Sequence, residues 1–307
     1  MPIAEEKVDV TVVDREVQSA RAPGRDRPQD RQGERVNPNQ ALWEQGDFTR
    51  IAETMRENGE DLMRQAGVGP GMRVLDLGCG DGTTAIPAAR LGAHVTGVDI
   101  ANNLVAAGRR RAAQAGLSDV CTFLQGDACK LSGIEDGSFD LVVSIFGAMF
   151  APRPFDVARE MVRVTRHGGR ILMGNWIPGD PTLVAQILKI SAAYSPPPPE
   201  GFVSPMTWGS TPHVLERFGA AGIASEAISW VRDRYVFDFK GSPAEFVDTF
   251  RRYYGPTMNA FRAAEQDGRA DALRDELVAL FEAHNQSQYP NTTLVSASFL
   301  KVTVDVG

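Results

Sequence analysis

The 307-residue chain contains only three cysteines, Cys79, Cys121 and Cys129. Three cysteines at this spacing predict neither a disulfide framework nor a zinc site, so we expect no bound metal. No apolar run approaches the roughly 20 residues that cross a bilayer, and the first residues lack the apolar core of a signal peptide. We therefore expect a protein of the reducing cytoplasm that does not span a membrane.

The chain also lacks an excess of basic residues. Lys and Arg number 32 against 39 Asp and Glu, which gives a formal net charge of −7. Proteins that bind a phosphate backbone usually present a basic face, so this balance argues against nucleic acid as a partner. The basic run at 109–111 lies in a helical pattern, and we interpret it as a solvated helix face.

The first 40 residues differ in composition from the remainder. Residues 1–40 are rich in Arg, Asp, Glu, Gln and Pro and hold few apolar residues. Such a segment buries too little surface to offset its ordering entropy, so we predict a flexible tail. Residues 41–307 are predicted to form a single domain, which begins with a helical pattern over 41–66.

Within residues 69–178, short apolar strands alternate with amphipathic helices. This alternation predicts an α/β, Rossmann-like fold, in which a mostly parallel sheet has helices on both faces. The predicted strands are 74–77, 94–100, 121–125, 141–146 and 170–176, and the predicted helices are 83–91, 102–115 and 155–166.

After Trp176 the alternation breaks. The proline-rich segment 177–209 could be a polyproline recognition site, but its bulky apolar flanks favour a stiff loop over a pocket. We predict two insertions that cover the core, at about 179–222 and 241–290. Further elements are expected as helices at 212–221, 243–266 and 270–284 and as strands at 228–239 and 294–304.

The segment VLDLGCGDG, at 74–82, carries the most chemical information. An apolar strand runs into a glycine-rich turn that opens a helix, which is typical of adenosine-containing cofactors. A dinucleotide site with G-x-G-x-x-G spacing needs a glycine at position 83, which is Thr83. The acids Asp76 and Asp81 would repel a pyrophosphate, but they suit a ligand with an ammonium and a sulfonium. The loop therefore favours S-adenosylmethionine over NAD.

Two more acids follow at strand ends. Asp99 stands about twenty residues past the loop, where a carboxylate can accept hydrogen bonds from both ribose hydroxyls. Asp127 ends the next strand and could accept the adenine amino group. Since an open α/β sheet binds its ligand at the carboxyl ends of its strands, these acids are expected to line one site.

Together these segments resemble the class I S-adenosylmethionine-dependent methyltransferases. The resemblance rests on VLDLGCGDG, GVDI (97–100), GDA (126–128), FDLVVSIF (139–146) and HGGRILM (167–173), and covers about residues 41–240. It implies a seven-stranded sheet whose antiparallel last strand, 294–304, fills one edge. It also implies S-adenosylmethionine as cofactor and S-adenosylhomocysteine as product.

The same resemblance implies a set of cofactor-binding residues. These are Asp76, Gly78, Cys79 and Gly80 for the methionine part, Asp99 with Ile100 for the ribose, Asn103 and Leu104 beside the ribose and adenine, Gly126, Asp127 and Ala128 for the adenine, Ser144, Ile145 and Phe146 beside the sulfonium, and Trp43 from a helix that closes over the cofactor. Cys79 is expected to serve through its backbone, and Asp81 to face solvent or cap the helix.

The methyl acceptor is expected to be a small molecule. Methyltransferases that act on DNA bases or glutamine typically carry an Asn/Asp-Pro-Pro-aromatic motif after the fourth strand, and residues 147–152 lack it. Candidate acceptor-binding residues are Phe48, Met149, Phe150, Trp176 and Trp208. Many of them could instead be core residues, and for Trp208 the two interpretations have equal weight. We assign no catalytic base, although His167, His213 and His284 could accept a proton.

Two alternatives remain open at this point. One is an NAD-dependent oxidoreductase, which Thr83 and the acidic loop disfavour. The other is a protein that binds S-adenosylmethionine as a sensor without turnover.

Overall fold

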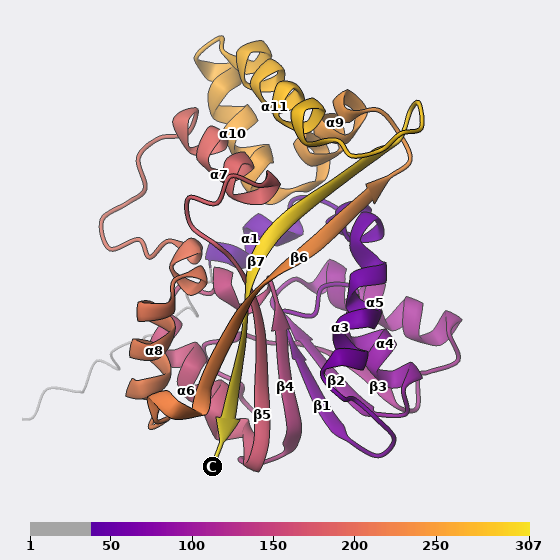
Figure 1. The fold of residues 1–307 in the computed structure, drawn as a ribbon, viewed down its shortest axis with the longest axis vertical. Helices are drawn as coiled ribbons and strands as arrows, with labels where there is room; N and C mark the ends of the chain where they lie inside the picture. Colours follow the sequence, from indigo (N-terminus) through magenta and orange to yellow (C-terminus); the bar gives the residue numbers. More distant parts are fainter. Residues whose placement is uncertain (1–37) are drawn as a thin grey trace, which may run out of the picture. The chain divides into compact units, whose positions relative to one another are not determined.

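The computed structural model describes residues 38–307, and the predicted tail lies almost entirely outside them. Seven strands form one sheet in the order β3-β2-β1-β4-β5-β7-β6 (Figure 1). They are β1 (Arg73–Leu77), β2 (His94–Asp99), β3 (Cys121–Gln125), β4 (Phe139–Ile145), β5 (Thr165–Trp176), β6 (Ile228–Phe239) and β7 (Thr293–Val306). The first five pair in parallel, whereas β7 runs antiparallel to both β5 and β6. The predicted fold class is confirmed.

One detail of the sheet differs from expectation. The last strand does not fill an edge: β7 lies between β5 and β6, and β6 is the edge strand. β7 pairs with β5 only from Phe299 to Val306, whereas it pairs with β6 from Thr293 to Val304. Its remaining residues therefore extend beyond the carboxyl end of β5.

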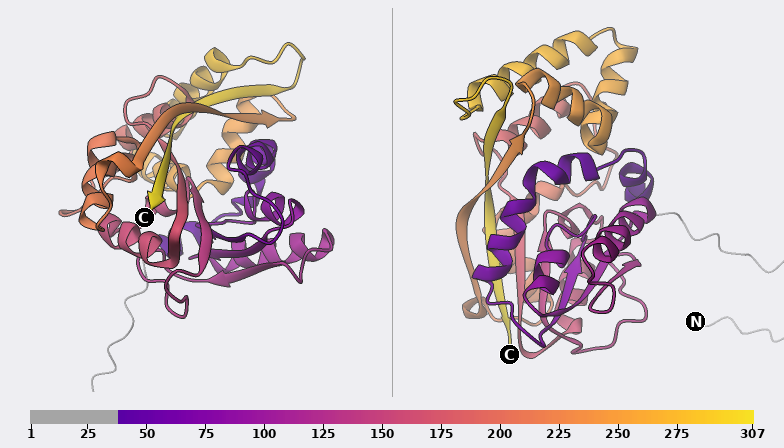
Figure 2. Two further views of the ribbon diagram at one scale, coloured as in Figure 1. Left: turned by 60° about the horizontal axis from the view of Figure 1, so that its bottom comes forward. Right: turned by 90° about the vertical axis from the view of Figure 1, so that its right-hand side faces the viewer.

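Helices flank the sheet. α4 (Ala85–Arg90) and α5 (Asn102–Gln114) lie beside β1 to β3, and α3 (Arg56–Gln65) packs against α4. On the other side α6 (Pro154–Val164) lies beside β4 and β5, and α8 (Thr211–Ala220) packs against α6 (Figures 1 and 2). All but the first residue of β1 are buried, as expected for a parallel strand covered on both faces. No helix within residues 38–307 is long and apolar enough to cross a membrane.

Four helices form a cap beyond the ends of β6 and β7 (Figure 1). They are α7 (Leu183–Ala193), α9 (Pro243–Tyr253), α10 (Gly255–Gln266) and α11 (Ala270–His284). The prediction of a loop over 177–209 was wrong for α7, because its prolines flank the helix instead of interrupting it. The predicted helix 243–266 is divided at Tyr254, since Pro256 starts a new helix there.

The N-terminal helical segment is broken into short pieces. It consists of α1 (Pro38–Glu44), α2 (Thr49–Ala52), the 3₁₀ turn η1 (Glu53–Met55) and α3, where one continuous pattern was predicted. The chain bends at Gly46, where a Cβ atom would lie 2.7 Å from the carbonyl oxygen of Tyr253. This close approach brings α1 and α2 against the cap.

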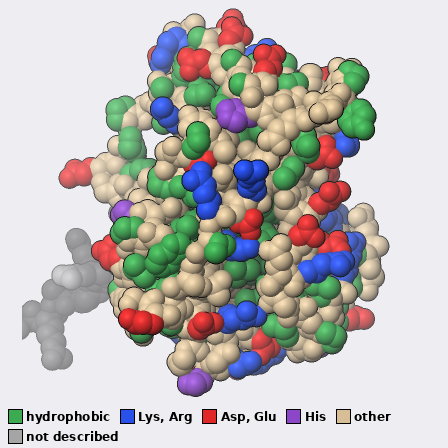
Figure 3. All heavy atoms as spheres, in the orientation of Figure 1, with side chains coloured by type: hydrophobic (Ala, Val, Ile, Leu, Met, Phe, Trp, Pro, Cys, Tyr) green, Lys and Arg blue, Asp and Glu red, His purple; other side chains and the backbone are tan. Residues whose placement is uncertain are grey.

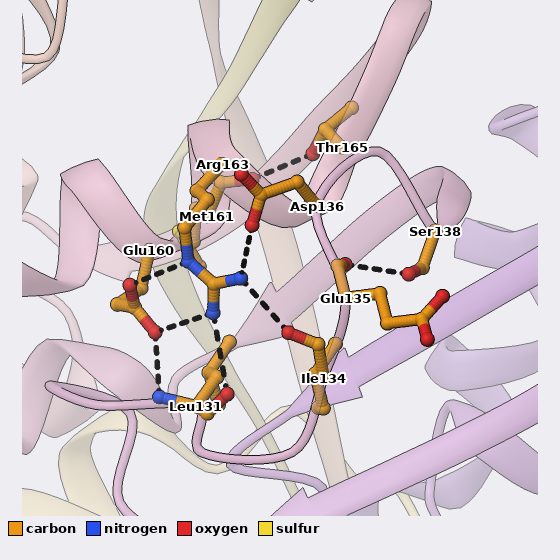
Figure 4. A network of polar contacts seen from close by, with 9 residues as sticks. All are labelled: Leu131, Ile134, Glu135, Asp136, Ser138, Glu160, Met161, Arg163 and Thr165. Carbon is orange, nitrogen blue, oxygen red and sulfur yellow. Dashed lines mark hydrogen bonds and ion pairs between the residues drawn. The ribbon is translucent and has the colours of Figure 1, made fainter.

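Arg163 on α6 holds the connection between β3 and β4 in place (Figure 4). Its guanidinium donates to both carboxylate oxygens of Glu160 at 2.8 Å and to Asp136 at 2.6 Å. It also donates to the carbonyl oxygens of Ile134 and Leu131. A planar guanidinium can make all of these bonds at once. The connection that begins with Gly126 and Asp127 is thereby anchored to the helix layer.

Candidate functional site

A cavity of about 970 Å³, part of it open to solvent, lies at the carboxyl ends of β1, β2 and β4. Fourteen of the predicted site residues line it. They are Trp43, Phe48, Gly78, Cys79, Gly80, Asp99, Ile100, Leu104, Gly126, Asp127, Ala128, Ile145, Phe146 and Phe150. The strand ends therefore meet at one place, as the topological rule for open α/β sheets predicts.

The glycine-rich turn forms the floor of this cavity. Gly78 and Gly80 have φ values of +72° and +54°, which only glycine adopts without strain. A Cβ atom on Gly78 would lie 2.5 Å from Cα of Gly147, so the turns after β1 and β4 touch there. A Cβ on Gly80 would meet no atom within 4 Å. The turn is therefore closed on the Gly147 side and open at Gly80.

Asp99 is buried at the end of β2. Its carboxylate accepts hydrogen bonds from the backbone N–H of Gly80 at 2.8 Å and of Ala101 at 2.9 Å. Burial raises its pKa, although these bonds oppose the rise. A carboxylate offers about four acceptor positions, so both oxygens can accept further bonds from a ligand in the cavity.

Asp76 lies beneath the turn and does not line the cavity. Its carboxylate accepts a hydrogen bond from the Thr84 hydroxyl. Burial raises its pKa to about 7. Neither Asp76 nor Asp99 forms an ion pair within residues 38–307. Two buried carboxylates without a cationic partner make this end of the sheet electronegative, which favours a ligand that carries positive charge.

The raised pKa of Asp76 predicts a pH dependence. Its value in the folded protein, about 7, lies above the ordinary 3.8, so the folded state binds this proton more tightly. The contribution of Asp76 to stability should therefore be full below about pH 4 and be lost as the pH rises to about 7. We expect Asp76→Asn to become more stable relative to the parent over this window, measured by urea unfolding without ligand. A stability difference that stays constant with pH would contradict the shift.

The prediction that Asp81 faces solvent or caps the helix was wrong. Its side chain is 1% exposed and forms ion pairs with Arg56 at 2.6 Å and Arg111 at 3.2 Å. Arg111 also donates to the backbone carbonyl of Asp81. The basic run at 109–111 is thus not merely a solvated face, because its last member ties α5 to the glycine-rich turn.

Cys79 contributes its backbone to the turn, in line with the sequence interpretation. Its backbone N–H donates to the carbonyl oxygen of Val98 at 3.1 Å. Burial raises the pKa of its thiol well above the ordinary value, and the nearby Asp99 and Asp76 carboxylates raise it further. A thiol held protonated in this way is a poor nucleophile.

Phe146 stands at the end of β4 with a φ of +59°, an uncommon conformation for a residue with a side chain. Its ring stacks on Trp176 at 3.6 Å and meets Tyr235 edge-on at 4.9 Å. Ser144 fixes this strand end, since its hydroxyl donates to the carbonyl oxygen of Leu77 and accepts from the N–H of Ala148. The strained backbone turns the Phe146 ring toward the cavity.

The N-terminal segment covers the cavity from the other side. The Trp43 ring meets Phe48 at 5.5 Å and Phe150 at 5.0 Å, both edge-on. Glu44 accepts hydrogen bonds from the backbone and side chain of Asn102, at the start of α5. Asn103 donates to the carbonyl oxygen of Gly46 at 3.1 Å. Helix α1 is therefore attached directly to the helix that follows Asp99.

Six predicted site residues do not line the cavity: Asp76, Asn103, Ser144, Met149, Trp176 and Trp208. The first three hold the elements around it, as described above. Trp208 is fully buried against Phe218 and under the Arg217 guanidinium, beside α8. No histidine of residues 38–307 lines the cavity.

Several lining residues had no signal in the sequence. Ala52 and Met55 reach the cavity because the N-terminal segment folds back over it, and Tyr235 reaches it from the distant strand β6. Tyr235 could have been predicted at the cavity only from the length of the β6–β7 hairpin.

The sheet order, the open end of the glycine-rich turn and the buried acids without ion pairs agree with a site for S-adenosylmethionine. A methyltransferase-domain family model matches residues 75–173. An uncharacterized protein of Mycobacterium tuberculosis is 35% identical over 238 residues, which are 76% of this chain and 83% of that protein. The chain belongs to the class I S-adenosylmethionine-dependent methyltransferase family, and its cofactor is S-adenosylmethionine.

Two further similarities agree with this assignment. A sterol 24-C-methyltransferase of Gibberella zeae is 39% identical over 120 residues, which are 39% of this chain and 31% of that enzyme. The crystal structure of the YcgJ protein from Bacillus subtilis superposes with a TM-score of 0.54 at 19% identity, and covers 82% of this chain and 99% of that protein. This structural likeness concerns the fold alone.

Proposed function

We propose that the protein transfers the methyl group of S-adenosylmethionine to a small, partly apolar molecule. The observation that carries this proposal is the composition of the cavity. Its lining combines the carboxylates Asp99 and Asp127 with the apolar side chains of Phe48, Met55 and Phe150. The carboxylates suit a charged, adenosine-containing cofactor, and the apolar side chains suit an apolar acceptor.

Within this proposal the cofactor-binding residues have distinct tasks. Asp99 accepts from the ribose hydroxyls, while Asp127 and Ala128 border the adenine. The turn at 78–80 lets the backbone approach the methionine part, and Phe146 borders the reacting centre. Each of these residues lines the same cavity.

When bound, the cofactor supplies a methyl group attached to a positively charged sulfur. The acceptor atom would contribute the electron pair of the new bond, and the electrons of the broken carbon–sulfur bond would stay on sulfur as a neutral thioether. The protein's main task is to hold acceptor and methyl in line. The packed residues around Phe146 and Trp43 restrict where an acceptor can approach.

A second support for a small acceptor is the surface charge. On the face shown in Figure 3, acidic and basic side chains of the described residues are interspersed, without a continuous basic patch. Together with the net charge of −7, this distribution disfavours a nucleic acid substrate.

Labelled cofactor tests the proposal. We expect the protein, incubated with methyl-labelled S-adenosylmethionine and a bacterial metabolite extract, to label a compound that partitions into organic solvent. Transfer to RNA, DNA or protein at an equal rate would contradict the proposed acceptor class. Tight cofactor binding without transfer to any fraction would instead support the sensor alternative.

A further inference from the structure

Tyr235 carries a buried hydroxyl that the fold itself does not use. The residue lines the cavity and is 1% exposed, and its hydroxyl has no hydrogen-bond partner within residues 38–307. Leaving such a group unpaired costs free energy that a phenylalanine would avoid. A ligand in the cavity that accepts a hydrogen bond would offset this cost.

The position of Tyr235 places this hydroxyl at the reacting end of the cavity. Tyr235 pairs with Ala297 in the part of the β6–β7 hairpin that extends beyond the end of β5. Its ring packs edge-on against Phe146 at 4.9 Å and against Phe299 at 6.0 Å. These two ring contacts hold the Tyr235 ring beside Phe146.

The surroundings of the hydroxyl determine its chemistry. Burial raises the pKa of Tyr235 above its ordinary value, and the nearby Asp76 carboxylate adds to the rise. The phenol therefore stays protonated at neutral pH and acts as a hydrogen-bond donor. Because Asp76 would repel a ligand carboxylate at this point, a neutral oxygen is the better acceptor.

We propose that Tyr235 determines acceptor specificity by donating a hydrogen bond to a neutral oxygen of the methyl acceptor, a carbonyl, hydroxyl or ether. The same cavity is also lined by the apolar side chains of Ala52, Met55 and Leu77. A hydroxyl that donates a hydrogen bond, together with these apolar side chains, selects a largely apolar molecule that carries an oxygen. This inference rests on the proposed function, because it concerns the acceptor of that reaction.

Isosteric probe pairs test the hydrogen bond without turnover. The probes are 1-naphthol against 1-methylnaphthalene and acetophenone against α-methylstyrene, titrated calorimetrically into protein saturated with S-adenosylhomocysteine. We expect the parent to bind the oxygenated member of each pair about tenfold more tightly. Tyr235→Phe should reduce this preference to less than about twofold while its affinity for S-adenosylhomocysteine stays within about threefold of the parent.

Tyr254→Phe is the matched control. Tyr254 is a buried tyrosine that packs against Trp43 but does not line the cavity. Its variant should keep the tenfold preference. Without ligand, Tyr235→Phe should melt about 1–3 °C higher than the parent, because an unpaired buried hydroxyl has been removed.

Three results would overturn the inference. One is a parent without preference for the oxygenated probes, including a failure to bind either of them. Another is a preference that persists in Tyr235→Phe. The third is a tenfold loss of S-adenosylhomocysteine affinity in that variant, which would assign the hydroxyl to the cofactor. If the protein prefers the oxygenated probes through Tyr235 but transfers no methyl group, the proposed function fails and the hydrogen bond of Tyr235 stands.

Discussion

Asp99→Ala is expected to weaken S-adenosylhomocysteine binding about a hundredfold, measured by calorimetric titration. In the proposed site the carboxylate accepts bonds from two ribose hydroxyls, and hydrogen bonds to charged groups are each worth about 1.5–3 kcal/mol. Coupled losses do not add fully, so about 3 kcal/mol is expected for the pair. Asp99→Asn keeps one acceptor oxygen and should lose about tenfold.

The free energy of unfolding of Asp99→Ala without ligand is a separate measurement. Asp99 accepts from the N–H groups of Gly80 and Ala101, so its removal leaves two donors without their acceptor. Since its charge is also disfavoured by burial, we expect a net loss of only about 1 kcal/mol. Asp61→Ala, at an exposed position on α3, controls for the change in net charge. An Asp99→Ala protein that binds S-adenosylhomocysteine as tightly as the parent would refute the ribose assignment.

The sheet and the cofactor half of the site could be predicted because their signals are local. Apolar strands alternating with helices imply parallel pairing, and parallel pairing brings the ends of β1, β2 and β3 to one edge. Residues at those ends, such as Gly80, Asp99 and Asp127, therefore line the cavity as expected. The sequence immediately around each of these residues was enough to predict its position.

The proposed acceptor-binding residues were predicted less well because their contacts are long-range. Tyr235 lines the same cavity as a turn about 160 residues earlier in the chain, and no periodicity in β6 indicates which cavity its face meets. The burial of Asp81 depends on Arg56 and Arg111 from two different helices. Trp208 was assigned to the acceptor by its size and position, but it fills the space beside α8 instead.

Helix α7 was not predicted, for a related reason. Prolines at 178, 181 and 196–199 suggested a continuous loop, although they only delimit the segment between them. Leu183, Val184 and Ile187 form the buried face of that helix. Proline content marks where a helix cannot pass, and it says little about the residues between two such points.

A large loss of stability is expected for Gly78→Ala. Its Cβ would lie 2.5 Å from Cα of Gly147 and 2.9 Å from the backbone nitrogen of Ala148, where no flexible side chain can move aside. The turns after β1 and β4 would have to separate. We expect a loss of about 3–5 kcal/mol, from overpacking added to the cost of a positive φ, measured by urea unfolding.

Gly80→Ala separates these two causes. Gly80 also has a positive φ, but a Cβ there would meet no atom within 4 Å. Only the backbone cost of about 1–2 kcal/mol should remain. Equal losses in the two variants would mean that the contact with Gly147 does not limit the turn, and that the positive φ alone requires glycine at both positions.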